Sequence, residues 1–212
     1  MEEPFRKDDL GQDNAAPFPH IPCNSTLRAT ARKRLDGNWF YAALTTLVYY
    51  LVGCATGCIP FAGLLVTLPL SFGFNLTFLK LRRGELDNEE MPVVMFDVFH
   101  KYGRYLGTGL LRAVYILLWT MLLIVPGIIM SYAYAMTPYI AHDNPELSAD
   151  ECIDYSQQMM KGHKWQLFCL DLSFIGWAFL CIFTMGIGLL WLVPYIQSSH
   201  AEFYENLKSL NE

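Results

Sequence analysis

Two charged side chains interrupt stretches of sequence that are otherwise apolar. Arg112 lies within GTGLLRAVYILLW, residues 107–119, and Asp171 lies within LFCLDLSFIGW, residues 167–177. A charge in hydrocarbon is unfavourable by a few kcal/mol, so such a residue faces the interior of a helix bundle and finds a partner. The chemistry indicated is therefore an intramembrane ion pair, or a polar path for a solute or a proton.

The register of three glycines brings a third polar residue to the same depth. Thr46, Arg112 and Asp171 stand at the same sequence distance after Gly37, Gly103 and Gly162, respectively. We therefore predict an intramembrane polar cluster of Thr46, Arg112 and Asp171, in which Arg112 pairs with Asp171. Three interpretations stay open: structural pairing, snorkelling of the long Arg112 side chain to the headgroups, and a substrate or proton path.

The composition indicates residence in a membrane. Of 212 residues, 53% are hydrophobic and 17% are charged, and the mean hydropathy is +0.26. A soluble domain of this length needs more charge to cover its surface. With 20 acidic against 15 basic residues, the net charge of -5 offers no basic surface for nucleic acid.

The residue types of common catalytic and metal sites occur without the required spacing. The six cysteines form no CxxC pair and are interpreted as small residues of helices, and the histidines are interpreted as solvated or interfacial. The chain contains no HExxH, P-loop or GxSxG pattern. We expect no catalytic residue, no bound metal and no cofactor, and hence no enzyme activity. The five histidines are His20, His100, His142, His163 and His200.

The lengths of the charge-free blocks predict an all-α membrane protein with six transmembrane helices arranged as three hairpins. A span needs about 20 residues, so the first charge-free block, residues 37–79, holds two spans. The second and third blocks are too long for one span and too short for two, unless Arg112 and Asp171 are included, which gives each block room for two. The predicted spans are about 39–56, 60–80, 105–125, 127–142, 165–184 and 188–207. The alternative is four spans, in which the second and third blocks each cross once as a long tilted or kinked helix.

Glycine and proline mark the predicted helix breaks, and basic residues set the orientation. The breaks are Gly57 and Pro60, Pro126 and Gly127, and Gly186 and Gly188. The 15 Lys and Arg avoid all three turns, which places every linker on one side of the membrane and favours six spans. By the positive-inside rule that side is cytoplasmic. We therefore expect a multi-pass membrane protein with both termini cytoplasmic.

The domain organisation follows from the same pattern. Residues 1–24 are polar and acidic and are predicted to form a disordered cytoplasmic tail, while residues 25–208 form a single membrane domain. Its hairpins are about 39–80, 105–142 and 165–207. A proline recurs in each return helix, at Pro69, Pro138 and Pro194, which is typical of an internal repeat.

A short cytoplasmic amphipathic helix is expected before each hairpin. In the first, Leu27, Ala31 and Leu35 recur every four residues and form an apolar stripe. The second presents Phe96 and Phe99, and the third opens with the capping box SADE at 148–151 and ends at Gly162. We expect these helices to lie in the membrane interface, with a partner-binding groove as the alternative. The residues assigned to the interface are Arg28, Arg32, Trp39, Lys161 and Trp165.

These segments resemble a bacterial integral-membrane family, domain of unknown function 975. The similar segments are RATARKRLDGNW (28–39), FLKLRRGE (78–85), the break at 126–127, SADECIDYSQQMMKGHKWQLFCLDLSFIGW (148–177) and PYIQSSHAEFYENL (194–207). The resemblance covers about residues 25–208 and implies a multi-pass protein of the bacterial inner membrane. It brings no assigned activity.

Two functions from different classes are expected on this basis. The first is a non-enzymatic protein that organises lipid or assists a complex, with the lipid bilayer and a membrane or cytoplasmic protein as partners. The alternative is a small transporter or exporter component that uses the Arg112–Asp171 site. A polar cavity that reaches Arg112 is the observation that separates them.

Overall fold

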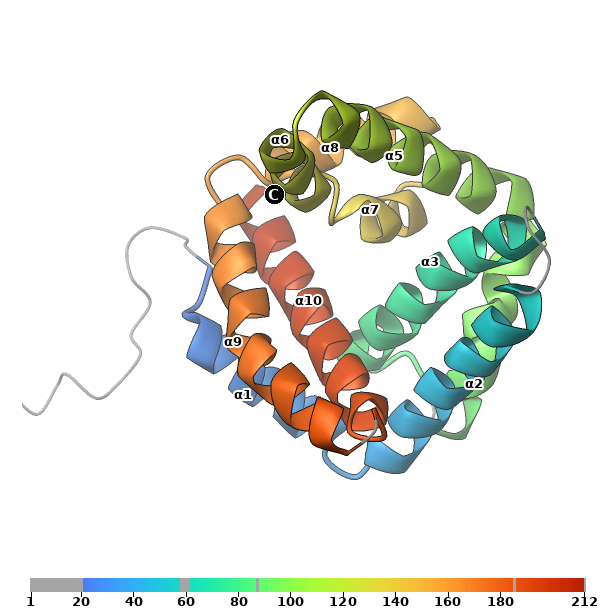
Figure 1. Ribbon diagram of the computed structural model, residues 1–212, viewed down its shortest axis with the longest axis vertical. Helices are drawn as coiled ribbons and strands as arrows, with labels where there is room; N and C mark the ends of the chain where they lie inside the picture. The colour runs from blue at the N-terminus through green and yellow to red at the C-terminus, as the bar shows by residue number, and fades with distance from the viewer. Residues whose placement is uncertain (1–20, 58–61, 87, 185, 212) are drawn as a thin grey trace, which may run out of the picture.

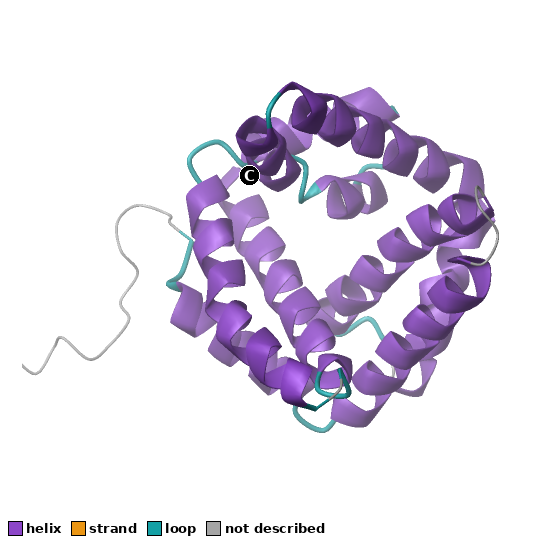
Figure 2. Ribbon diagram, viewed as in Figure 1, coloured by secondary structure: helices purple, strands orange, loops and turns teal. Residues whose placement is uncertain are grey.

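The computed structural model of the chain describes residues 21–57, 62–86, 88–184 and 186–211. Within those ranges all regular structure is helical, and no strand occurs (Figure 2). The predicted all-α class is therefore confirmed. The predicted tail, residues 1–24, lies mostly outside the described part of the chain.

The N-terminal part contains three long helices and a group of short ones. The helices are α1 (Asn24–Leu35), α2 (Trp39–Gly57), α3 (Ala62–Arg83) and α4 (Met91–Val94), with two 3-10 helices, η2 (Asn88–Glu90) and η3 (Met95–Lys101).

The C-terminal part contains six helices. They are α5 (Tyr102–Leu122), α6 (Ile124–Ala133), α7 (Thr137–Asp143), α8 (Ala149–Met159), α9 (Lys164–Phe183) and α10 (Leu189–Asn211).

The long helices surround α7 in the view down the shortest axis (Figure 1). Helices α2 and α3 form one side and α9 and α10 the opposite side, while α5, α6 and α8 lie across the end between them. Sequence neighbours α2 and α3, α5 and α6, and α9 and α10 pack in pairs, and α10 also packs on α1, α2 and α3. Helices α3 and α10 are therefore central to the fold.

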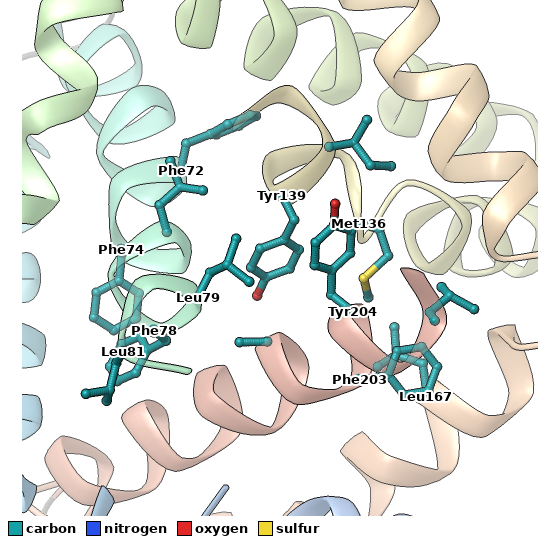
Figure 3. Close-up of a cluster of buried hydrophobic side chains, with 14 of the residues drawn as sticks. Phe72, Phe74, Phe78, Leu79, Leu81, Met136, Tyr139, Leu167, Phe203 and Tyr204 are labelled. Atoms are coloured by element: carbon teal, nitrogen blue, oxygen red, sulfur yellow. The ribbon is translucent and has the colours of Figure 1, made fainter. Parts of the chain in front are cut away.

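Aromatic and methionine side chains fill the space between α3, α7 and α10. Phe72 and Phe78 of α3, Met136, and Tyr139 of α7 are fully buried, as is Tyr204 of α10 (Figure 3). The rings of Tyr139 and Tyr204 stack with their centroids 4.9 Å apart. This cluster fixes α7 against α10 and thereby positions the residues that follow Tyr139 along the chain.

The outer surface is apolar over much of its area. Met121 is 79% exposed, Ile124 71% and Phe183 85%, values that would leave apolar side chains in water if no lipid covered them. Three segments of the described chain are long and apolar enough to cross a membrane: Trp39–Gly57, Met91–Leu122 and Ile124–Asp143. These observations support membrane association.

The break between α5 and α6 lies at Leu123, not at Pro126 and Gly127. Leu123 is extended, with φ -161° and ψ 140°, and α6 starts at the next residue. Pro126 and Gly127 then occupy the first turn of α6, where a helix tolerates proline because its first amide groups have no intrahelical acceptor. Pro126 therefore lies at the start of a helix. The predicted break between the two helices was placed three residues too late in the sequence.

The other predicted breaks agree where they are described. Gly57 is the last residue of α2, and Gly186 has a φ of 85° in the turn between α9 and α10. Gly188 lies in the same turn, close to Cys181: a Cβ at Gly188 would lie 2.7 Å from its Sγ. Pro60 lies outside the described residues.

The predicted span 127–142 lies within the candidate span Ile124–Asp143, but two helices, α6 and α7, make up this segment. A turn at residues 134–136 separates α6 from α7, and Pro138 sits in the first turn of α7. Because proline disfavours the helical conformation of the residue before it and cannot donate to the preceding turn, the helix ends and restarts there. The result is a short α7 that enters the centre of the molecule.

Two of the three predicted amphipathic helices are confirmed. Helix α1 buries Leu27, Ala31 and Leu35, and α8 opens with a capping box in which Ser148 and Glu151 exchange hydrogen bonds. The second is a 3-10 helix, η3, in which Met95 and Val98 are buried and Phe96 is exposed.

The three glycines that opened the predicted repeat differ in conformation. Gly37 and Gly162 have φ values of 81° and 84°, and each follows an amphipathic helix and precedes a long one. Gly103 instead lies inside α5. The first and third copies of the pattern thus share this turn, and the middle copy lacks it.

Candidate functional site: a polar cavity between six helical segments

A cavity of about 440 Å³ lies between α3, α5, α6, α7, α9 and α10. Its lining is mainly polar although it lies among apolar helices. The lining residues are Asn75, Arg112, Ile128, Ser131, Tyr132, Ala135, Tyr139, Leu167, Asp171, Gln197 and His200. Arg112 and Asp171, predicted from the sequence to share one site, therefore line the same cavity.

Close packing of α5 on α3 directs Arg112 toward the interior. A Cβ at Gly109 would lie 3.3 Å from the ring of Phe72 on α3, so the helices approach closely at this position. Arg112 follows almost one turn later on the same side of α5. Its Nε is buried without a hydrogen-bond partner, and no described residue forms an ion pair with its guanidinium.

Two further polar atoms in the cavity are buried without partners. They are the hydroxyl of Tyr139, a residue that is 2% exposed, and the Oε1 of Gln197. Buried polar groups are normally hydrogen-bonded, and each exception needs an explanation such as a bound molecule. A donor, an amphoteric hydroxyl and an acceptor are thus available to a solute at one place.

Asp171 pairs with His200 instead of Arg112. His200 Nε2 lies 2.6 Å from Asp171 Oδ1, and the two side chains are 21% and 30% exposed. The predicted Arg112–Asp171 ion pair is therefore absent from the described residues. The physical reason is that α10 presents His200 directly to Asp171 of α9, so the carboxylate has a nearer partner on the adjacent helix.

Thr46 does not belong to the cavity. It is fully buried on α2, and its hydroxyl donates to the carbonyl oxygen of Ala42 at 2.9 Å. Such a bond to the preceding turn satisfies a threonine hydroxyl inside a helix. The predicted cluster thus keeps Arg112 and Asp171 and loses Thr46.

Sequence reasoning missed Tyr139, Gln197 and His200. His200 was interpreted as solvated or interfacial, yet it lies half-buried in the polar cavity. The signal that was available is the polar stretch QSSH, residues 197–200, which interrupts the apolar face of a predicted span. Tyr139 follows Pro138, and only the unpredicted turn before α7 brings it to the centre.

A separate charged network joins one end of α3, α7 and α10. The Arg83 guanidinium donates to both carboxylate oxygens of Asp143, at 2.9 and 2.6 Å, and to Glu205 at 2.7 Å. Lys208 and the Tyr204 hydroxyl also donate to Asp143, at 2.9 and 3.0 Å. These hydrogen bonds raise the pKa of Arg83 and of Lys208, Asp143 being the main partner of each.

The adjacent Arg82 forms a second link between the same helices. It donates from Nε and Nη2 to the two carboxylate oxygens of Glu202 on α10, at 2.9 and 3.2 Å. Bidentate pairs of this kind are stronger and more directional than single bonds. The end of α3 is therefore fastened to α10 twice.

The predicted interfacial residues lie at the surface or at its edge. Arg28 is half-buried on α1, with its guanidinium carbon 6.0 Å from the Phe174 ring centroid, whereas Lys161 is exposed. Arg32 lies over Tyr195, its guanidinium carbon 5.7 Å from the ring centroid. Trp165, at the start of α9, is 72% exposed, and Trp39 starts α2.

No metal centre is found in the part of the chain that the structure describes. There, no group of three or more His, Cys, Asp or Glu side chains is placed to hold a metal ion. In the cavity, Asp171 and His200 contact each other and offer two possible metal ligands, fewer than such a group of three.

Comparison with known proteins finds a family match in the C-terminal part of the chain. No curated protein and no solved structure matches the sequence. A family described as "Protein of unknown function (DUF975)" matches residues 114–211. The match includes the break at 126–127 and the segments 148–177 and 194–207 but neither 28–39 nor 78–85, so it is shorter than the resemblance predicted. Residues 114–211 of the chain are therefore similar to the DUF975 family.

Proposed function

We propose that this protein is a membrane-embedded binding protein for a small anionic solute and acts as a transporter or exporter component. The observation that supports this is the unpartnered guanidinium of Arg112 beside the unpartnered Tyr139 hydroxyl and Gln197 carbonyl oxygen in one cavity. An unpaired buried charge is unfavourable, and a carboxylate or phosphate would compensate it with charge-assisted hydrogen bonds.

The lining also defines the chemical class of the solute. The guanidinium favours one planar or tetrahedral anionic group, and Gln197 Oε1 is free to accept a hydrogen bond from a hydroxyl or ammonium group of the same molecule. Asp171 excludes a second anionic group near His200. A cavity of about 440 Å³ suits a metabolite-sized molecule.

The topology proposed with this function is six spans in the bacterial inner membrane, with both termini cytoplasmic. In it, α2 and α3, α5 and α6–α7, and α9 and α10 form the three hairpins. Support comes from the pairwise packing of these helices and from the charged network at the shared end of α3, α7 and α10, where basic linkers are expected. No catalytic step is proposed.

Binding is tested on the purified full chain in detergent. Inorganic phosphate, lactate and succinate are added in turn, and the unfolding temperature is measured across concentrations. A solute that binds the folded state raises this temperature with concentration. We expect at least one of these anions to stabilise the wild type, and Arg112→Gln to abolish the effect because the variant lacks the guanidinium.

The matched control is Lys101→Gln, which removes one exposed positive charge just before α5. This variant should respond to the anions like the wild type. If none of the three anions stabilises the wild type, or if Arg112→Gln responds equally, the proposal is wrong. Uptake of the stabilising anion into proteoliposomes, lost in Arg112→Gln, then separates transport from binding alone.

A second candidate is a non-enzymatic protein that organises lipid or assists a complex. The observation in its favour is α1, which buries Leu27, Ala31 and Leu35 and carries Arg32, Lys33 and Arg34 in its last turn. Such a helix at a bilayer surface attracts anionic lipid, at about 1 kcal/mol per basic residue. Anion-insensitive stability together with lipid-dependent stability would favour this function.

A further inference from the structure

A groove of about 310 Å³ lies between the end of α1, the start of α2 and the facing halves of α9 and α10. Most of its surface is apolar, and it is separate from the polar cavity: the two share no lining residue. Trp39, Trp177 and Trp191 line it together with Leu180 and Tyr195, and Arg32 provides its charged group.

Specific contacts between α1, α2 and α10 position the residues at the charged end of the groove. The hydroxyl of Tyr195 donates to the carbonyl oxygen of Arg28 at 3.2 Å, which fixes the Tyr195 ring against α1. That ring packs edge-on against Trp39, with centroids 6.3 Å apart, and lies 5.7 Å from the Arg32 guanidinium carbon. Arg32 is exposed, and no carboxylate of the described residues pairs with it.

The apolar end extends along α9 and α10 away from Arg32. Trp177 is 54% exposed, Leu180 58% and Trp191 48%, so the groove opens onto the apolar outer surface and not into the protein. The two helices lie close together at Gly188, because Cys181 fills the space that a side chain at this position would need. The groove thus has one cationic end and one long apolar end.

We infer that this groove is a specific site for one anionic phospholipid of the bilayer. The phosphate of the lipid is held by Arg32 above the Tyr195 ring, and an acyl chain lies along Trp177, Leu180 and Trp191. Indole rings are favoured where an apolar chain meets a polar group, because each ring is amphipathic. The site is independent of the proposed solute cavity, since Arg112 and Arg32 belong to different regions.

The test uses the tryptophans as reporters in the full chain, purified in detergent. Phosphatidylglycerol with brominated acyl chains quenches a nearby indole on contact, and brominated phosphatidylcholine is the neutral comparison. We expect saturable quenching by the anionic lipid at lower concentration than by the neutral one. Unbrominated phosphatidylglycerol should reverse it, whereas inorganic phosphate, which lacks the acyl chain, should not.

Two pairs of variants locate the site. Arg32→Gln should weaken the binding of the anionic lipid about fivefold, which corresponds to the loss of one basic residue near a lipid phosphate. Arg34→Gln, which changes an exposed residue of the same helix, should leave the binding unchanged. The double variant Trp177→Phe, Trp191→Phe should lose the anion-selective part of the quenching, whereas Trp119→Phe on α5 should keep it.

Three results would overturn the inference. The first is equal quenching by the two lipids, and the second is an equal loss in Arg32→Gln and Arg34→Gln, which would indicate diffuse attraction to α1. The third is displacement of the brominated lipid by inorganic phosphate alone. None of these results bears on anion binding by Arg112, so this inference and the proposed function can fail separately.

Discussion

At the residue scale, the polar cavity is defined by what its members lack. Arg112, Tyr139 and Gln197 each keep a buried atom without a partner, although they line one space. Packing alone would favour apolar residues at these positions, since an unsatisfied polar group weakens a fold. A site that accepts this loss of stability is typical of a binding function.

Replacing Arg112 with methionine should stabilise the protein and abolish anion binding. Methionine fills a similar volume without a charge, and an arginine in the middle of a membrane helix is unfavourable by about 2.5–3.5 kcal/mol on insertion scales. We expect the free energy of unfolding in detergent to rise by roughly 1–3 kcal/mol. Lys101→Met, at an exposed position, should change it by less than about 0.5 kcal/mol. A large loss of stability in Arg112→Met would show that the guanidinium has compensating contacts.

A double-mutant cycle tests the partner of Asp171. Because His200 Nε2 lies 2.6 Å from Asp171 Oδ1, Asp171→Asn and His200→Asn should couple by about 1 kcal/mol in the free energy of unfolding. Asp171→Asn and Arg112→Gln, which share no direct contact, should couple by less than about 0.5 kcal/mol. If Asp171 instead couples more strongly to Arg112 than to His200, the Arg112–Asp171 pair predicted from the sequence is the correct one.

At the element scale, the fold depends on where helices approach closely. Gly73 of α3 faces the backbone carbonyl of Met95 in η3, at a position where a Cβ would collide with it. Gly53 of α2 has no neighbouring atom within 4 Å of such a Cβ. Gly73 therefore permits a close crossing of α3 and η3, whereas a side chain at Gly53 would meet no neighbouring atom.

Substituting alanine at these two glycines should have opposite effects. Gly73→Ala forces α3 and η3 apart and should lower the free energy of unfolding by about 1–3 kcal/mol, a typical value for overpacking. Gly53→Ala should raise it by up to about 1 kcal/mol because alanine favours the helix. Thermal unfolding of both variants in one detergent gives the comparison, and a neutral Gly73→Ala would contradict the close crossing.

The same scale shows what the sequence could and could not predict. Capping chemistry and helical periodicity are local, so the capping box of α8 at Ser148 and the helix α1 with its stripe of Leu27 and Leu35 were predicted correctly. The division of the span 127–142 into two helices depends on how Pro138 enters the core, which no local pattern determines. The Asp171–His200 pair depends on the rotation of α9 against α10 and was missed for the same reason.

At the scale of the whole molecule, the apolar outer surface and the proposed six spans lead to one topological test. In a variant without native cysteines, single cysteines at Gly57, Leu123 and Ile187 should react with an impermeant reagent from outside the cell. Leu123 and Ile187 are 63% and 61% exposed, so labelling is sterically open. Cysteines at Glu146 and Lys161 should react only after lysis, and their labelling from outside would support four spans.

The charged network has a mechanical consequence for the polar cavity. Arg83, Asp143, Glu205 and Lys208 tie α3, α7 and α10 together at one end by several short charge-assisted bonds. In the described part of α3 and α10, no ion pair involves residues 62–79 or 189–199. In the proposed transporter, the tied end would serve as a pivot, and a tilt of these helices would widen the gap with distance from it. An aperture into the cavity would form toward the end opposite the charges, so release and uptake of a solute would be unequal on the two sides of the membrane.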